Sequence, residues 1–161
     1  MLSVIPGYGY TQTIVTGISN DKFTRTFNET TNKEYVQPDD VNLRALHNFK
    51  KSFKEAQKVN WYKVKEGYMV YFYYNGNKKA CGYDFNGNWL YKLVSYTEEK
   101  LPRPIWYQIK SVYYAYSIVW ANEIETANKT IYVIHLEDPE TSKNIKVCEG
   151  AMDVIEEFKK K

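Results

Sequence analysis

The chain has 161 residues and a formal net charge of +3, with 43% hydrophobic and 25% charged residues. This composition is that of an ordinary globular protein, and the length suits one domain or two small ones that share a core. The positive charge is too small, and the lysines are too scattered, to predict a nucleic-acid partner. The sequence holds no run of 18 apolar residues, so we expect no membrane-spanning helix.

The aromatic content is unusual, because 16 Tyr, 7 Phe and 4 Trp make up 17% of the chain. Tyrosine favours β-strands, and it also suits surfaces that bind a partner, since it covers a large area with few rotatable bonds. A tyrosine-rich antiparallel sheet explains the composition without any binding role. The composition therefore indicates a sheet and leaves open whether one of its faces binds a partner.

Residues 1–39 form a polar segment rich in threonine and asparagine, with little helical periodicity. Its β-branched residues predict two short strands, at residues 10–15 and 22–27, that could add to the edge of a sheet. A disordered leader explains the same composition equally well. Residues 1–20 lack a basic start followed by a long apolar stretch, so no intact signal peptide is expected.

Residues 40–97 predict a first α+β unit. Asp40 is the expected N-cap of a helix. One face of this helix is marked by apolar residues at three- and four-residue steps: Leu46, Phe49, Phe53 and Ala56. Four strands are then expected, at Val59–Lys65, Tyr68–Tyr74, Lys79–Phe85 and Trp89–Tyr96. Asn75-Gly76 predicts the hairpin turn after the second of them, since both residues tolerate a positive φ.

Residues 98–161 predict a second unit of the same kind, which makes the chain one compact domain of two repeats. Pro102 and Pro104 suit the first turn of its helix. The apolar face of that helix is expected to hold Ile105, Ile109, Val112 and Tyr116. Strands are expected at Ser117–Thr126, Thr130–Glu137 and Lys143–Cys148. Ala151–Phe158 fits a strand or a helix, and the repeat favours a strand.

The two units also share residues. Ser52, Ala56, Val59 and Trp61 recur 59 residues later as Ser111, Ala115, Ile118 and Trp120. After a four-residue insertion, Tyr68–Tyr71 matches Ile131–Ile134 at an offset of 63. The predicted core therefore includes the matched tryptophans and four helix-stripe residues: Trp61, Trp120, Phe49, Phe53, Ile109 and Val112. Cys81 and Cys148 fall at non-equivalent positions, so free buried thiols are expected, while adjacent strands would allow a disulfide.

Several of these features occur together in one known family. They are the first helix, the Trp61 strand, the Tyr68–Phe72 strand, the Tyr83–Trp89 turn, and Leu101-Pro102-Arg103-Pro104-Ile105 before the second helix. In this order the set resembles the beta-lactamase-inhibitor-like, PepSY-like proteins, which are small exported proteins common in gut Bacteroidetes. The resemblance covers roughly residues 40–158. It implies two tandem helix-plus-four-strand units, one curved antiparallel sheet with both helices on one face, and a periplasmic or secreted location.

The resemblance also points to a binding role. The inhibitor for which the family is named grips a hydrolase with the concave aromatic face of its sheet, although most members have no established activity. The candidate partner-binding residues in this chain are aromatic residues of the predicted strands: Tyr62, Tyr71, Tyr73, Trp89, Tyr91 and Tyr132. We expect them to bind a protein or peptide. The alternative is a carrier in which the same curved sheet holds a small apolar or glycan ligand.

The sequence contains little that indicates catalysis. Asp84–Asn88 carries the oxygen ligands of half a calcium loop, but a self-bonded hairpin turn explains it as well. The acidic pairs Glu98-Glu99 and Glu123/Glu125 suit a solvated linker and a strand face better than a glycosidase site. Ser52 and Ser111 lack a nearby base, and two histidines are too few for a zinc site. We therefore predict a non-catalytic protein without a metal or cofactor.

Overall fold

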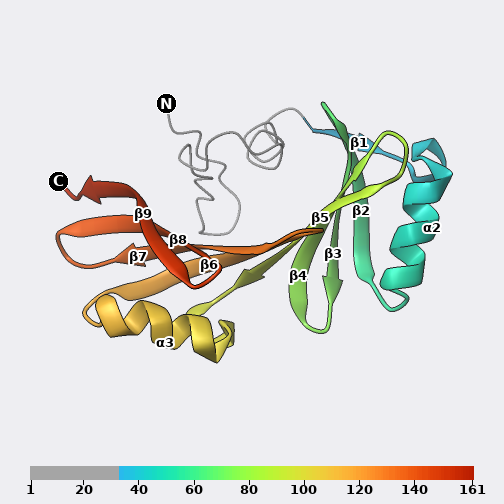
Figure 1. The fold of residues 1–161 in the computed structure, drawn as a ribbon. Coiled ribbons are helices and arrows are strands. Elements are labelled where there is room, and N and C mark those ends of the chain that lie inside the picture. The colour runs from blue at the N-terminus through green and yellow to red at the C-terminus, as the bar shows by residue number, and fades with distance from the viewer. Residues whose placement is uncertain (1–32) are drawn as a thin grey trace.

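The structure, a computed structural model, describes residues 33–161. Nine strands form one antiparallel sheet, in which the spatial order of the strands follows their order in the chain (Figure 1). The strands are β1 (Glu34–Val36), β2 (Gln57–Val64), β3 (Gly67–Tyr74), β4 (Asn77–Asp84), β5 (Trp89–Tyr96), β6 (Ser117–Thr126), β7 (Thr130–Glu137), β8 (Thr141–Cys148) and β9 (Ala151–Lys159). The predicted α+β class and single antiparallel sheet are confirmed.

Two helices accompany the sheet. Each follows a short 3₁₀ turn, so η2 (Pro38–Asp40) leads into α2 (Leu43–Ser52), and η3 (Glu98–Lys100) leads into α3 (Arg103–Val112). In Figure 1, α2 lies beside β2, and α3 lies below β6 and β7. Four strands follow each helix, so the order of element types is the same in residues 38–96 and 98–159.

The predicted strands agree with the structure to within about two residues. β5, β6 and β7 form with the predicted bounds, and the last segment is a strand rather than a helix. The hairpin turn at Asn75-Gly76 is confirmed, because both residues have a positive φ, of 51° and 72°. The strands predicted at residues 10–15 and 22–27 lie outside the described residues. At the edge of the sheet next to β2, the structure describes the short strand β1.

The first helix begins and ends differently from its prediction. Its N-cap is Asn42, whose side chain accepts a hydrogen bond from the backbone N–H of Arg44 at 2.9 Å. Asp40 belongs to the preceding 3₁₀ turn. The helix ends at Ser52, so Phe53 is its C-cap and Ala56 lies beyond it. The apolar stripe continues past the helix because the chain turns back onto the same cluster, which both Phe53 and Ala56 contact.

A dense aromatic cluster holds α2 against the sheet. Phe49, which is 3% exposed, lies between α2 and the strands. Its ring centroid is 5.5 Å from that of Trp61 and 4.9 Å from that of Phe72, both in edge-to-face geometry. Such pairs add stabilisation beyond the burial of their area. The predicted core positions Phe49 and Trp61 are thus buried, and Phe53 packs against the same cluster.

A second cluster lies beneath α3, where Ile109 is fully buried against residues of β6, β7 and β8. Val112 does not belong to this cluster. It is the last residue of α3 and is 55% exposed, so the prediction that it is a core residue is wrong. The helix ends there, and the chain buries Tyr113 and Tyr116 against the cluster instead.

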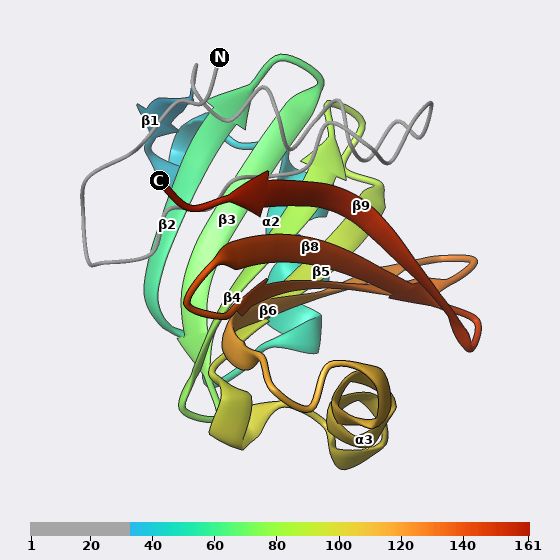
Figure 2. The same cartoon turned by 90° about the vertical axis from the view of Figure 1, so that its left-hand side faces the viewer.

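A third cluster contains no helix residue and joins the two halves of the sheet. Val64, Met69 and Ala80 of β2–β4 share it with Ile131 and Val133 of β7. The sheet is therefore bent, and in Figure 2 β8 and β9 are seen in front of β2–β4. This central cluster therefore buries the inner side of the fold.

The tryptophans matched in the sequence lie on opposite faces of the sheet. Trp61 packs beneath α2, whereas Trp120 lies in the central cluster, where it stacks on His135. The caps of the two helices show why the match of Trp61 to Trp120 at an offset of 59 residues is wrong. Phe53 and Tyr113, which lie 60 rather than 59 positions apart, donate equivalent backbone hydrogen bonds to Phe49 and Ile109. A shift of one residue reverses every side chain of a strand.

Neither cysteine is in a disulfide, as predicted. Cys81 is fully buried, and burial raises the pKa of its thiol to about 12. Cys148 is only partly buried. The thiol of Cys81 therefore behaves as a small apolar group of the core.

The Asp84 turn between β4 and β5 is closed by its own side chain. Asp84 Oδ1 accepts hydrogen bonds from the backbone N–H groups of Asn86 (2.9 Å) and Asn88 (2.8 Å), and Oδ2 accepts one from Asn88 Nδ2 (2.8 Å). These bonds lower the pKa of the carboxyl group, with the Asn88 side chain as the largest cause. The turn also contacts α2, since Asn48 donates to the carbonyl oxygen of Gly87 at 3.2 Å. A self-bonded hairpin turn therefore accounts for the oxygen-bearing side chains of this segment.

Replacing Phe49 by alanine should lower the free energy of unfolding by about 3–5 kcal/mol, because it leaves a cavity among three aromatic rings. Leu43→Ala in the same helix is the matched control. Leu43 is 80% exposed, so its loss should change the free energy of unfolding by less than about 0.5 kcal/mol. Urea unfolding followed by circular dichroism measures both, and equal effects would contradict the packing described.

Replacing Asp84 by asparagine should make stability less dependent on pH. The pKa of Asp84 is lower in the folded state, so its contribution is complete above the unfolded value of 3.8 and is lost as the pH falls through the folded value. The Tm of the variant should therefore lie below that of the wild type at pH 7 and approach it towards pH 2. Thermal unfolding at a series of pH values tests this, with Asp153→Asn, an exposed carboxylate, as control. A difference in Tm that stays constant with pH would contradict it.

Candidate functional site

Four tyrosines form a patch on the face of β1–β3 that points away from α2. Val70 and Phe72 pack beneath α2, so the intervening Tyr71 and its neighbour Tyr73 point to the opposite side. Tyr62 is paired with Met69 on β3, and Tyr35 is paired with Tyr62. Directly paired residues lie on the same face. We call this group, Tyr35, Tyr62, Tyr71 and Tyr73, the tyrosine patch.

The rings of the tyrosine patch support one another. The centroids of Tyr35 and Tyr62 are 5.9 Å apart and those of Tyr62 and Tyr71 are 5.6 Å apart, both edge-to-face. Tyr35 is 53% and Tyr73 is 42% exposed, while the other two are half-buried. Burial, followed by the neighbouring Tyr62, raises the pKa of Tyr71 to about 12. The patch thus presents a semi-rigid aromatic surface whose Tyr71 hydroxyl stays protonated at neutral pH.

Three lysines surround the tyrosine patch: Lys33, Lys58 and Lys78. Lys33 Nζ lies 4.8 Å from the ring centroid of Tyr62 and 4.7 Å from that of Tyr71. Lys78 reaches Tyr71 at 5.8 Å, and Lys58 reaches Tyr73 at 5.4 Å. Burial and the charge of Lys78 lower the pKa of Lys33. No ion pair with a described carboxylate neutralises these lysines, so the patch is electropositive.

The other three predicted binding residues do not join the patch. Tyr91 is 1% exposed within the central cluster, where its ring fills the space beside Gly82. Trp89 packs against the α2 cluster on the opposite face. The strand is irregular between these two residues, and this reverses the face. Tyr132 lies by the α3 cluster, and its hydroxyl donates to Glu123 at 3.0 Å.

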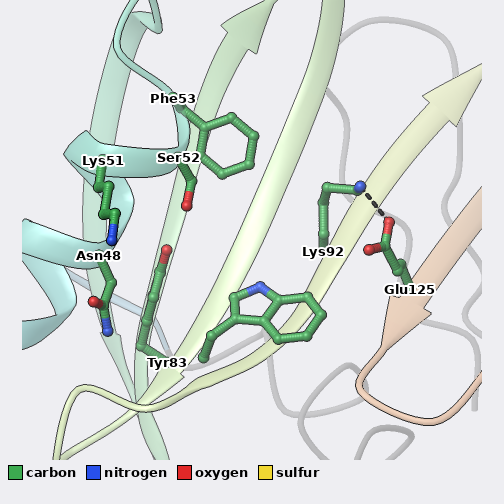
Figure 3. A pocket seen from close by; sticks show the side chains of 8 residues that line it. Asn48, Lys51, Ser52, Phe53, Tyr83, Lys92 and Glu125 are labelled. Carbon is green, nitrogen blue, oxygen red and sulfur yellow. Dashed lines mark ion pairs between the residues drawn. The ribbon is translucent and has the colours of Figure 1, made fainter.

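A pocket that the sequence did not predict lies on the α2 side of the sheet (Figure 3). Its volume is about 590 Å³. It is lined by Asn48, Lys51, Ser52 and Phe53 at the end of α2, by Tyr83 of β4, by Trp89 and Lys92 of β5, and by Glu125 of β6. Lys92 and Glu125 form an ion pair at one side. These residues come from separate elements, so no sequence motif indicates the site.

One carboxylate of each acidic pair, Glu98 or Glu123, is hydrogen-bonded within the fold. Glu98 accepts hydrogen bonds from the indole N–H of Trp106 at 3.0 Å and from the backbone N–H of Ile118 at 3.3 Å, which ties the linker to α3 and β6. Glu123 accepts bonds from the hydroxyl groups of Tyr96 and Tyr132. None of these contacts pairs a nucleophile with a base, which is the arrangement that covalent catalysis needs.

In residues 33–161 there is no helix long and apolar enough to cross a membrane. No protein-family model matches the sequence, and no curated protein matches it. Solved structures do match its fold.

A BLIP-like protein from Bacteroides fragilis superposes with a TM-score of 0.62 at 19% identity, over 77% of this chain and 88% of that one. A DUF2874 family protein from Bacteroides ovatus gives a TM-score of 0.61 at 18% identity, over 74% and 87%. A candidate periplasmic protein from Bacteroides eggerthii gives 0.60 at 15% identity, over 74% and 88%. At these identities the likeness is one of fold: the chain has the fold of the DUF2874 family and BLIP-like proteins of Bacteroides.

Proposed function

We propose that this chain is an exported, non-catalytic protein that binds a protein or peptide through the tyrosine patch. The observation that carries the proposal is the patch itself, in which four tyrosines share one face with three lysines that lack acidic partners among the described residues. Tyrosine anchors combine apolar area with a polar hydroxyl and lose little side-chain entropy on binding. Of the predicted binding residues, Tyr62, Tyr71 and Tyr73 belong to this surface, and Trp89, Tyr91 and Tyr132 do not.

The charge of the patch specifies the chemistry of the partner. The ammonium groups of Lys33 and Lys78 both lie over the ring of Tyr71, and burial, followed by the charge of Lys78, lowers the pKa of Lys33. Carboxylates of a partner would complement these positive charges. We therefore infer an acidic segment that lies across β1–β3, and its affinity should fall as the salt concentration rises.

We further propose that the domain consists of two repeats, residues 40–97 and 98–161, related by an offset of 60 in their helices. Equivalent positions support this offset. Val41 and Leu101 each follow a 3₁₀ turn and are 3% exposed. Phe49 and Ile109 accept the bonds that cap their helices. With this alignment, the matched helix residues Phe49 and Ile109 each pack with a residue of the first strand of their own repeat, Trp61 and Ile118.

The register of the central strands supports placing both helices on one face. Cys81, which packs beneath α2, pairs with Lys92, and Lys92 pairs with Glu125. Glu123 lies two residues before Glu125 in the same strand, so their side chains share a face. Tyr132, which contacts the α3 cluster, donates to Glu123. The tyrosine patch is then on the face that carries neither helix.

The proposals that the protein is exported and that it is not an enzyme are supported by its fold. A structure with the same fold is a candidate periplasmic protein, and others are BLIP-like and DUF2874 proteins. In each of the acidic pairs weighed as catalytic, one carboxylate, Glu98 or Glu123, accepts hydrogen bonds within the fold, and Glu125 forms an ion pair with Lys92. A fold alone does not determine a function, so the binding surface has to be tested directly.

The test replaces Tyr62, Tyr71 and Tyr73 together by alanine. The partner is captured from an envelope fraction with the wild-type chain and identified, and its Kd is measured by calorimetry with wild type and variant. The variant should bind at least about 30-fold more weakly, because one anchoring aromatic contributes about 2 kcal/mol. Raising the salt concentration should weaken the wild-type complex.

The control variant replaces Tyr107 and Tyr114, which are 65% and 83% exposed at and beyond α3, by alanine. It should keep the wild-type Kd. Circular dichroism first establishes that both variants fold. Equal affinities of the two variants for the captured partner, or an affinity indifferent to salt, would contradict the proposed surface or its charge.

A further inference from the structure

The pocket between α2 and β4–β6 lies on the opposite face of the sheet from the tyrosine patch. Tyr83 and Trp89, which line it, belong to the α2 cluster, whereas Tyr71 and Tyr73 point away from that cluster. The volume of about 590 Å³ falls within the range of 300–1,000 Å³ that is typical of small-molecule sites. What this pocket binds is therefore a separate question from what the patch binds.

Tyr83 supplies a polar group inside the pocket. The residue as a whole is 2% exposed and lines the pocket, and its hydroxyl is not among the described side-chain atoms that are buried without a hydrogen-bond partner, so the hydroxyl opens into the pocket. In Figure 3 this hydroxyl points towards that of Ser52, which stands at the end of α2 and makes no hydrogen bond with another described side chain. A ligand in the pocket can replace the water that such a hydroxyl binds, and it gains affinity when it reproduces that hydrogen bond.

Aromatic rings form the rest of the inner wall. Trp89 and Phe53 both line the pocket and are only partly buried. The ring of Phe53 can be seen at its wall in Figure 3. They suit a ring-shaped ligand that has an apolar face. A flexible chain would leave this flat surface incompletely covered.

The polar groups around the wall are mixed in kind. Lys51 and Lys92 are donors, Glu125 is an acceptor, and Asn48 retains its amide oxygen as an acceptor. The end of α2 adds more acceptors, because the last carbonyl groups of a helix have no intrahelical partner. The negative end of the helix dipole also disfavours an anion there. The site therefore suits a neutral ligand with many hydroxyl groups, each of which both donates and accepts.

We propose that this pocket binds a neutral sugar ring. The apolar face of the ring lies on Trp89 or Phe53, and its hydroxyl groups bond Tyr83, Ser52 and the polar groups of the rim. A fatty acid or an aromatic carboxylate would leave the acceptors at the helix end unused and would place its charge at the unfavourable end of the dipole.

The test is saturation-transfer difference NMR on the full chain with four neutral sugars: methyl β-D-glucopyranoside, methyl β-D-galactopyranoside, methyl α-D-mannopyranoside and cellobiose. Indole-3-acetate serves as the apolar anion. At least one of the sugars should show saturation transfer that saturates on titration, and it should bind more tightly than indole-3-acetate.

Two variants locate the site. Tyr83→Phe removes only the hydroxyl and should weaken sugar binding by about 2- to 10-fold, the effect of one hydrogen bond. Ser52→Trp fills the pocket from an exposed position and should abolish binding. Tyr73→Phe is the control, because it removes a hydroxyl from the tyrosine patch, and it should leave sugar binding unchanged.

Three results would overturn the proposal. They are the absence of saturation transfer from all four sugars, tighter binding of indole-3-acetate, and sugar binding that is the same in Tyr83→Phe as in the wild type. If Ser52→Trp does not fold, the nearly isosteric Tyr83→Phe variant still tests whether the sugar binds in this pocket. The alanine variant of Tyr62, Tyr71 and Tyr73 should keep sugar binding, so a failure of the tyrosine patch proposal is distinguishable from a failure of this one.

Discussion

The pairing of β5 with β6 joins two helix-and-strand units into one sheet. It runs from Tyr91 opposite Thr126 to Tyr96 opposite Ala121, and it carries the backbone ladder across the middle of the protein. Because the ladder is continuous, the helix of each half lies on a defined face of the sheet. The sheet bends at the junction, and the central cluster is buried between its two halves. The position of the tyrosine patch, at the far end of β1–β3, and that of the pocket, beside β5 and β6, both follow from this junction.

Much of the fold could be predicted from the sequence, because β-branched and aromatic runs between Asn-Gly and similar turns specify strands locally. It was harder to predict which face of the sheet each strand residue occupies. Trp89 and Tyr91 would share a face in a regular strand, but an irregularity between them places one under α2 and the other in the central cluster. A similar irregularity between Ile118 and Trp120 accompanies the failed match of Trp120 to Trp61. A bulge is decided by the packing of both neighbouring strands, and the sequence of one strand does not contain that information.

The tyrosine patch and the pocket differ in how far they could be predicted from the sequence. The tyrosine patch comes mainly from neighbouring strands with strong aromatic content, so its members Tyr62, Tyr71 and Tyr73 could be named in advance. The pocket combines the end of α2 with single residues of three strands. One of its polar groups, the hydroxyl of Tyr83, becomes a candidate ligand contact only because the fold places it in the wall of the pocket. Such a property arises from the folded arrangement and has no counterpart in a residue pattern.

The order of the strands has a consequence for how the chain folds. Proteins built of sheets tend to fold slowly, because distant segments must meet before their contacts stabilise anything. Here every described strand pairs only with its neighbours in sequence, and the two longest connections, residues 37–56 and 97–116, each hold a helix. Each pairing therefore closes a short loop at a small entropic cost. A nine-stranded sheet of this kind has a low contact order and can grow from any hairpin, and packing of the central cluster is the step that brings distant parts of the chain together.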